Sequence, residues 1–158
     1  MMEVTSIATF ECEIVSKEFK LIGQSITANY PQSFPNAAIE VQVEFLKKVD
    51  EIKNCKNKKV LLSPYMCNDI MATYFACLEV EEIADVPEDM VGFAIPLMKY
   101  AKVSCSNKTI DKGYSKIFEW MGENGYSQKW YDKSFPIEIY YLEGAEEEIV
   151  EILIPINE

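Results

Sequence analysis

The feature that most constrains this chain is an order of predicted elements that occurs twice. A strand pattern, a helix pattern and two more strand patterns occupy residues 10–82, and the same order recurs over residues 92–157. The acidic, proline-containing segment 81–91 joins the two repeats. Such a duplication predicts an α+β fold, in which an antiparallel sheet carries both main helices on one face and a central cleft lies where the equivalent halves meet.

Local periodicity assigns the elements within each repeat. Apolar residues recur at helical spacing after the proline-rich break at 30–36, and again after Thr109. In the first helix they are Ile39, Val43, Phe45, Leu46, Val49 and Ile52, and in the second Tyr114, Ile117, Phe118 and Met121. The predicted strands are 10–28, 59–66, 71–82, 92–105, 135–142 and 148–156, and the predicted helices end near residues 53 and 123.

Length and charge exclude several classes of protein. The chain has 158 residues, which is the size of one domain, so we expect a single domain over 1–158. Its formal net charge is −11, from 15 basic and 26 acidic residues, whereas nucleic-acid binding relies on basic side chains at the phosphates. We therefore expect no direct binding of nucleic acid by this chain.

The sequence also argues against a membrane protein. No stretch approaches the ~20 apolar residues that a membrane helix needs. The N-terminal segment lacks the basic and apolar regions of a signal peptide, so the expected location is the cytoplasm.

The composition contains few of the residues and motifs that bind metals or cofactors. The chain has no histidine, and its five cysteines are scattered without a C-x-x-C pair. Its glycines form no nucleotide-binding motif. We expect reduced thiols, no metal and no cofactor. A serine or cysteine nucleophile would lack its histidine, so a carboxylate acting on water is the enzymatic design that the composition supports.

The last predicted hairpin carries the most informative pair of residues. A turn centred between Gly144 and Ala145 would set Glu138 opposite Glu151, with the two side chains ~5 Å apart. Alternation then places both carboxylates, with Tyr140, on the face opposite the most apolar one. Such a pair would suit a lipophilic cation, and a desolvated carboxylate would equally serve as a general base on water. The alternative is a solvated face on which the acids only maintain solubility.

Aromatic side chains are the second resource for a binding site, since the chain has nine tyrosines, eight phenylalanines and two tryptophans. Rings can line a pocket for an aromatic or cationic molecule, but rings at helix or strand spacing also fill cores, and both alternatives stay open. The candidate pocket residues are Tyr65, Tyr74, Tyr100, Tyr114, Trp120 and Trp130.

Four segments of the chain carry a resemblance to a known family. They are residues 74–105 (YFACLEVEEIADVPEDMVGFAIPLMKYAKVSC), 113–126 (GYSKIFEWMGENGY), 135–141 (FPIEIYY) and 148–156 (EIVEILIPI). Together they resemble the middle, the second helix and the paired last strands of the GyrI-like small-molecule (effector) binding domain. The resemblance spans most of the chain, and the combined spacing of aromatic, glycine, proline and glutamate positions makes it fairly specific.

This resemblance implies a GyrI/SOUL-like fold of two β-α-β-β units that binds a small hydrophobic, cationic or aromatic molecule in its central cleft. Similar domains bind the ligands of multidrug-responsive AraC-type and MerR-type transcription regulators, so this chain would be a stand-alone effector-binding or sequestering module. Glu138 matches the family glutamate that contacts cationic ligands, and Glu151 matches the second family glutamate.

Two alternatives follow from the same resemblance. Some stand-alone relatives are similar to hydrolases that open strained, electrophilic rings of genotoxic molecules, and there Glu138 would be the catalytic acid/base. Others are similar to inhibitors of DNA gyrase, which act by binding a protein. A protein partner therefore stays open, as does a homodimer formed through exposed sheet edges.

Overall fold

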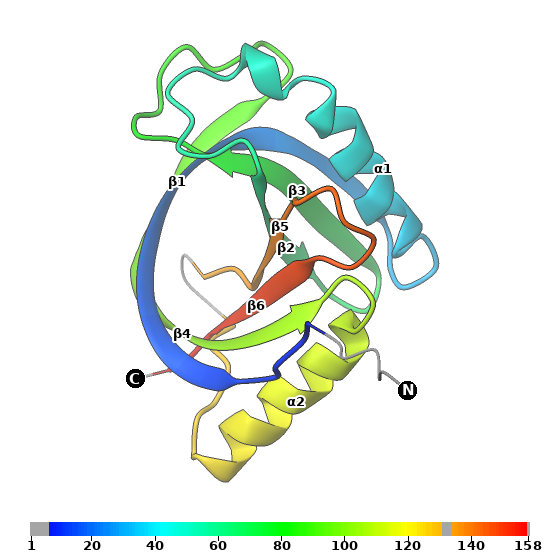
Figure 1. Cartoon of the computed structure of the whole chain (residues 1–158), viewed down its shortest axis with the longest axis vertical. Coiled ribbons are helices and arrows are strands. Elements are labelled where there is room, and N and C mark those ends of the chain that lie inside the picture. Colours follow the sequence, from blue (N-terminus) through cyan, green and yellow to red (C-terminus); the bar gives the residue numbers. More distant parts are fainter. Residues whose placement is uncertain (1–6, 131–133, 158) are drawn as a thin grey trace, which may run out of the picture.

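In the computed structural model, which describes residues 7–130 and 134–157, the strands close into an antiparallel barrel in the order β1-β3-β2-β5-β6-β4 (Figure 1). Residues 1–6 lie outside the described ranges. They begin the N-terminal segment for which the sequence predicts no signal peptide. The strands are β1 (Cys12–Asn29), β2 (Val60–Cys67), β3 (Met71–Glu79), β4 (Val91–Ser106), β5 (Ile137–Tyr141) and β6 (Ile149–Pro155). The helices are α1 (Asn36–Leu46), η1 (Val49–Glu51) and α2 (Ile110–Glu123).

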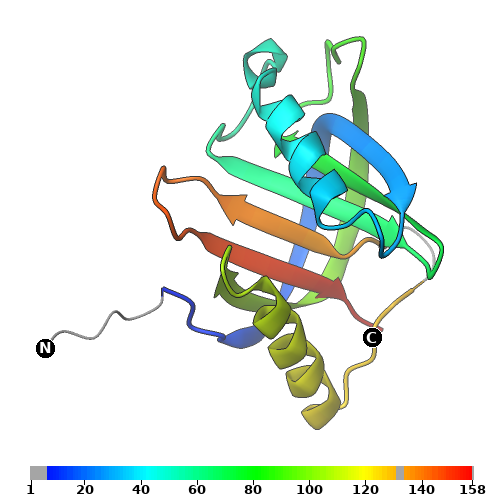
Figure 2. The same cartoon turned by 90° about the vertical axis from the view of Figure 1, so that its right-hand side faces the viewer.

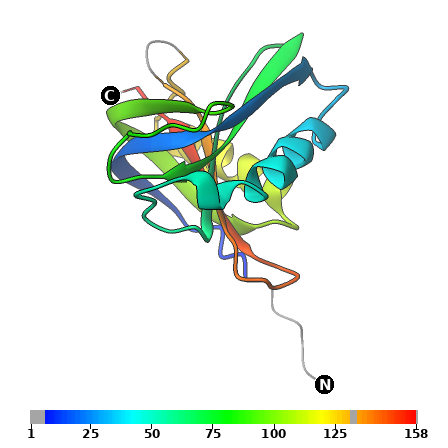
Figure 3. The same cartoon turned by 90° about the horizontal axis from the view of Figure 1, so that it is seen from above.

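Both predicted repeats are present in the predicted order. The units β1-α1-β2-β3 and β4-α2-β5-β6 follow each other, so the α+β class with a duplicated antiparallel sheet is confirmed. They join along two seams, where β1 pairs with β4 and β2 pairs with β5. Both helices lie on the same side of the barrel, against its outer wall (Figures 2 and 3). In Figure 2 the outer surface of β5, drawn in orange, runs between α1 and α2.

Alternation along the strands separates two sets of apolar residues. One set fills the barrel interior and includes Phe19, Leu62 and Leu153. On the outer wall, Phe45 of α1 belongs to a second cluster and Ile117 of α2 to a third. Because the sheet is closed, each strand residue faces either the interior or the outer wall, and a shift of one residue in register exchanges the two.

The first helix is shorter than predicted and buries a different face. α1 ends at Leu46, and only the short helix η1 continues toward residue 53. Its buried side chains are Ala37, Val41 and Phe45, of which only Phe45 was among the predicted apolar residues. The predicted Ile39, Val43 and Leu46 are exposed. Both sets recur at helical spacing on opposite sides of the helix, so spacing alone could not identify the side that packs on β1 and β3.

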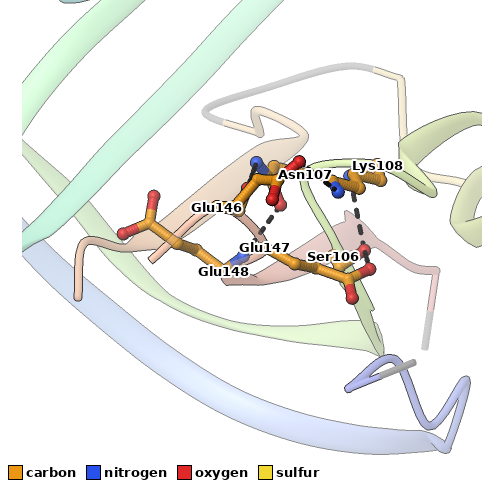
Figure 4. Close-up of polar contacts among 6 residues, drawn as sticks. All are labelled: Ser106, Asn107, Lys108, Glu146, Glu147 and Glu148. Atoms are coloured by element: carbon orange, nitrogen blue, oxygen red, sulfur yellow. Dashed lines mark hydrogen bonds and ion pairs between the residues drawn. The ribbon is translucent and has the colours of Figure 1, made fainter. Parts of the chain in front are cut away.

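Asn107, which follows β4, connects two turns at one end of the barrel. Its N–H donates to the Glu148 carbonyl at 3.0 Å, and the Glu148 N–H donates to Asn107 Oδ1 at 2.8 Å. Asn107 Nδ2 also donates to the Glu146 carbonyl, and the buried Ser106 hydroxyl donates to Glu147 Oε2 at 2.6 Å (Figure 4). These contacts hold the β5–β6 turn against the start of α2 and so fix β5 relative to that helix.

Barrel closure also bears on association. In the described part of the chain every strand of the barrel has two neighbours, so the expectation of exposed sheet edges is wrong.

All five cysteines are free thiols; Cys77 and Cys105 are buried, whereas Cys67 is exposed. Among the described residues, no helix has the length and apolar character needed to span a membrane.

Phe45→Ala is expected to lower the free energy of unfolding by about 3–5 kcal/mol, because removal of a fully buried ring leaves a cavity. Val43→Ala, on the exposed side of the same helix, is expected to change it by no more than ~0.5 kcal/mol. Chemical unfolding followed by circular dichroism measures both values. Equal losses would mean that α1 packs through the face that contains Val43.

Candidate ligand-binding site

The β5–β6 hairpin has a register one residue away from the predicted one. Glu138 pairs with Ile152, and Ile139 pairs with Glu151, so the predicted pairing of Glu138 with Glu151 is wrong. Because successive strand residues face opposite sides of a sheet, Glu138 faces the outer wall and Glu151 faces the barrel interior. The two carboxylates therefore belong to different environments.

Glu138 is 8% exposed, and both of its carboxylate oxygens accept hydrogen bonds from tyrosines. Oε1 accepts from Tyr74 at 2.5 Å and from Tyr140 at 2.6 Å, and Oε2 accepts from Tyr114 at 2.5 Å. Within the described ranges, no lysine lies within ion-pair distance of Glu138. An ionised carboxylate can only accept, so three O–H donors satisfy it without any opposite charge.

A second layer surrounds these contacts. The hydroxyl of Tyr65 lies 2.8 Å from that of Tyr114, and its ring stacks on Tyr74 with centroids 6.1 Å apart. Gln42 of α1 donates through Nε2 to the Tyr74 hydroxyl and to Ser63 Oγ, each at 3.3 Å. The central group, which we call the Glu138 cluster, consists of Glu138, Tyr65, Tyr74, Tyr114 and Tyr140.

Burial and the neighbouring carboxylate both keep the phenols of the Glu138 cluster protonated. Desolvation is the largest cause that raises the pKa of Tyr65, Tyr74, Tyr114 and Tyr140. The charge of Glu138 raises the pKa of each further, because a phenolate beside a carboxylate would form a like-charge pair. The four phenols thus remain O–H donors throughout the physiological pH range.

More rings extend from the Glu138 cluster toward solvent in both directions. On the α1 side, the ring centroid of Phe34 lies 6.4 Å from that of Tyr74 and 5.9 Å from that of Tyr30. On the α2 side, Phe118 stacks on Tyr114 with centroids 6.4 Å apart. Tyr30 is 37% exposed and Phe118 is 44% exposed. A row of rings therefore leads from solvent past the carboxylate and out again.

Sequence reasoning did not select Tyr30, Phe34, Phe118 or Gln42 as site residues. For the rings, signals were available: Tyr30 and Phe34 lie among prolines just before α1, and Phe118 follows Tyr114 by about one helical turn. Gln42 carries no such signal, because its contacts depend on which face of α1 packs against the barrel.

The structure brings together four of the predicted aromatic residues beside Glu138, and it places the other candidates elsewhere. Tyr100 is fully buried in the barrel interior, with its ring 6.3 Å from that of Phe19. Trp120 stacks on Tyr126 with centroids 5.6 Å apart, and Trp130 is 75% exposed. In the described part of the chain, no hydrogen bond or ring contact joins Tyr100, Trp120 or Trp130 to the Glu138 cluster.

The Glu138 cluster combines groups that can attract an organic cation. It combines one anionic group with the faces of several aromatic rings, and both attract a positively charged molecule in a poorly hydrated site. Across residues 7–130 and 134–157, no three histidine, cysteine, aspartate or glutamate side chains are grouped to hold a metal ion.

A family model described as "Cass2: Integron-associated effector binding protein" matches residues 13–156 of the chain. The chain belongs to this family. Membership in the Cass2 family confirms the resemblance to GyrI-like effector-binding domains, and it supports the binding of a small molecule in general. The matched residues include the whole Glu138 cluster. No curated protein shows significant sequence similarity to the chain.

Solved structures share this fold at low sequence identity. SAV2435 bound to tetraphenylphosphonium is similar with a TM-score of 0.68 and 17% identity, over 93% of this chain and 94% of that one. The C-terminal domain of EcmrR has a TM-score of 0.64 and 14% identity, over 95% and 99% of the two chains. An integron cassette protein of Vibrio cholerae has a TM-score of 0.61 and 14% identity, over 95% and 97%. At these identities the likeness shows the fold alone.

Alkaline titration is expected to leave the tyrosines of the Glu138 cluster protonated until the barrel unfolds. Their pKa values in the folded protein are raised above the unfolded value of about 10. The resulting stabilisation is therefore fully present below pH ~10 and is lost as the pH rises further. Phenolate absorbance and circular dichroism, recorded together for the wild type and for Tyr74→Phe, measure this. A Tyr74 signal that titrates before the loss of structure would contradict the buried arrangement.

Proposed function

We propose that this protein binds a lipophilic organic cation between α1 and α2, with Glu138 as the counter-charge and the rings of the Glu138 cluster as walls. The observation that carries the proposal is a buried carboxylate whose hydrogen-bond partners are all neutral phenols. Two further findings support it: the chain belongs to an effector-binding family, and SAV2435, which has the same fold, binds tetraphenylphosphonium.

Binding requires a rearrangement, because Glu138 is almost fully buried. Oε1 is held by Tyr74 and Tyr140 on the strands β3 and β5, whereas Oε2 is held by Tyr114 on α2. Tyr114 is also bonded to Tyr65 of β2, and both side chains are partly exposed. Movement of Tyr114 away from both Tyr65 and Oε2 would open Oε2 and two ring faces to the ligand. Oε1 would stay bonded, so the carboxylate would keep its orientation.

The charge of the ligand decides whether this rearrangement is favourable. A cation replaces the lost phenol bond with a charge-assisted contact worth about 1.5–3 kcal/mol, and it gains about 0.5–2 kcal/mol from each well-placed ring. A neutral molecule of the same shape leaves a buried acceptor unsatisfied, which costs about 1–3 kcal/mol. The site should therefore select by charge among molecules of similar shape.

Glu138→Gln is expected to weaken the binding of tetraphenylphosphonium by about 10- to 100-fold, because the amide keeps the shape of the side chain and removes its charge. Isothermal titration calorimetry on the wild type and the variant measures the change. The matched control is Glu151→Gln, which makes the same substitution on the other face of the sheet and should leave the Kd unchanged. Tetraphenylborate, an anion of nearly the same shape, should not bind.

Three outcomes would overturn this proposal. Unchanged affinity in Glu138→Gln would show that the carboxylate does not contact the ligand. Binding of tetraphenylborate as tight as that of tetraphenylphosphonium would show that the site does not select by charge. Chemical consumption of a bound electrophile by the wild type but not by Glu138→Gln would support the hydrolase alternative, in which Glu138 acts on water.

Two substitutions separate the hydroxyl of Tyr114 from its ring. Tyr114→Phe is expected to bind tetraphenylphosphonium at least as tightly as the wild type, because the phenol bond to Oε2 no longer has to break. Tyr114→Ala should bind about 3- to 30-fold more weakly, since it lacks the ring face. The same calorimetry measures both. A loss in Tyr114→Phe as large as in Tyr114→Ala would mean that the hydroxyl itself holds the ligand.

A further inference from the structure

The barrel interior contains a cavity on the side of the sheet that faces away from the Glu138 cluster. This barrel-end cavity measures about 200 Å³, and each of the six strands contributes to its lining. Elsewhere in the interior, by contrast, the rings of Phe75, Phe93 and Phe135 pack on one another. The volume is several times that of a water molecule at ~30 Å³, yet it is below the ~300–1,000 Å³ of a drug-sized site. It therefore suits a small metabolite.

Apolar and charged side chains divide the lining between them. The buried residues Leu62, Ile139 and Leu153 provide an apolar surface. The lining also contains Phe19, Val60 and Tyr141, and four charged residues, two of each sign: Lys17, Lys102, Glu79 and Glu151. The cavity thus has no net charge but presents separated positive and negative groups beside an apolar surface.

The ion pair inside the barrel is the least expected part of this lining. Lys102 Nζ lies 3.1 Å from Glu151 Oε2, and these side chains are only 21% and 18% exposed. Tyr141 donates to Glu151 Oε1 at 2.5 Å. Removing two ions from water is costly, and well-packed apolar residues would stabilise a barrel at least as well. Stability alone therefore does not account for charged groups at these interior positions.

Several of these groups have capacity for another partner. Each oxygen of Glu151 retains a lone pair beyond the contact it makes. The Lys102 ammonium has three donors and also lies 3.7 Å from Glu13 Oε1, and Glu79 pairs through Oε2 with Lys56 at 3.6 Å, which leaves its other oxygen for a ligand. Lys17 is exposed and makes no ion pair with any residue in the ranges 7–130 and 134–157. The cavity can thus accept an ammonium group and a carboxylate group at the same time.

We infer that the barrel-end cavity binds a free α-amino acid with an apolar side chain. Its ammonium group faces Glu151 and Glu79, its carboxylate faces Lys102 and Lys17, and its side chain covers the apolar surface. A ligand with a single charge would compete with one partner of the Lys102–Glu151 pair and leave the opposite groups unmatched. A zwitterion extends both charges of the pair without disturbing their balance.

This site is independent of the proposed cation site. The two share strands β2, β3 and β5 but use opposite faces of them: on β5, Glu138 and Tyr140 lie on the outer face, whereas Ile139 and Tyr141 line the cavity on the inner face. A substitution at one site should therefore leave the ligand of the other site bound as before.

The test uses L-leucine and two analogues, each of which lacks one charged group: 4-methylpentanoate and 3-methylbutylamine. Nuclear magnetic resonance titration of the wild type should show L-leucine binding, with shifts at the amides of β4 and β6, and at least 10-fold weaker binding of both analogues. Lys17→Met and Glu151→Gln should each weaken L-leucine binding at least 5-fold. Val60→Phe, which fills the cavity from β2, should abolish it. Glu138→Gln is the matched control and should leave it unchanged.

Each contrary result would overturn the inference. Failure of L-leucine to bind the folded wild type at millimolar concentration would show that the barrel-end cavity is not an amino-acid site. Equal binding of either analogue would show that the site does not require both charges of a zwitterion. Loss of L-leucine binding in Glu138→Gln would show that the ligand binds at the Glu138 cluster instead. If Glu151→Gln does not fold, Lys17→Met decides, because Lys17 is exposed and its replacement leaves the interior ion pair intact.

Discussion

A carboxylate buried without a counter-charge is the constraint on which the rest of this structure depends. Taking an ionised group out of water costs several kcal/mol unless donors replace the water. For Glu138 three phenols replace it, and they come from β3, β5 and α2. Other contacts position these elements: Gln42 connects α1 to one phenol, and Asn107 holds the start of α2 against the turn that follows β5. These contacts together keep three hydroxyls on one carboxylate.

Barrel closure gives the two sides of one sheet different chemistry. Ile139 pairs with Glu151 and directly follows Glu138, yet the two carboxylates are separated by the sheet itself. The outer one is surrounded by neutral phenols, and the inner one is paired with Lys102. An unpaired negative charge suits a ligand that brings a positive charge, whereas a paired charge suits a ligand that brings both. Two adjacent positions in a hairpin can therefore take part in two kinds of recognition.

The sequence was sufficient to predict the repeat and the element order, because these depend on local periodicity, whereas the role of Glu138 as a site residue stays a prediction. It was not sufficient for the hairpin register. The turn was predicted to be centred between Gly144 and Ala145, whereas the observed pairing centres it on Ala145. This shift of half a residue places Glu151 on the face of the sheet opposite to Glu138. The Glu148 carboxylate accepts the N–H groups of Glu143 at 2.5 Å and Gly144 at 2.9 Å, so a side-chain contact shapes the turn. Turn composition alone does not reveal such a contact.

A similar limit applies to α1, where apolar residues at helical spacing occur on two sides and only tertiary packing selects one. The tyrosines of the Glu138 cluster lie on β2, β3, β5 and α2, so their convergence depends on strand order and on where α2 crosses the barrel. Their identity as candidates came from residue type, and Tyr100 and Trp120 satisfied the same criterion without joining them. Residue type therefore identifies candidate residues for a site, but the tertiary structure of the closed sheet determines which of them lie together.

The closed state of the Glu138 cluster also has a consequence for selectivity. An open pocket lined by rings would admit any apolar molecule of suitable size, since burial of apolar surface does not depend on charge. In the proposed cation site a ligand would first have to break the hydrogen bond from Tyr114 to a buried carboxylate, and only a cation would restore what is lost. Under this proposal, discrimination against neutral molecules would arise from a hydrogen bond that the free protein makes within itself, as in other sites where unpaired polar groups penalise the wrong partner. Neutral phenols are suited to this role, because they satisfy the carboxylate without cancelling its charge.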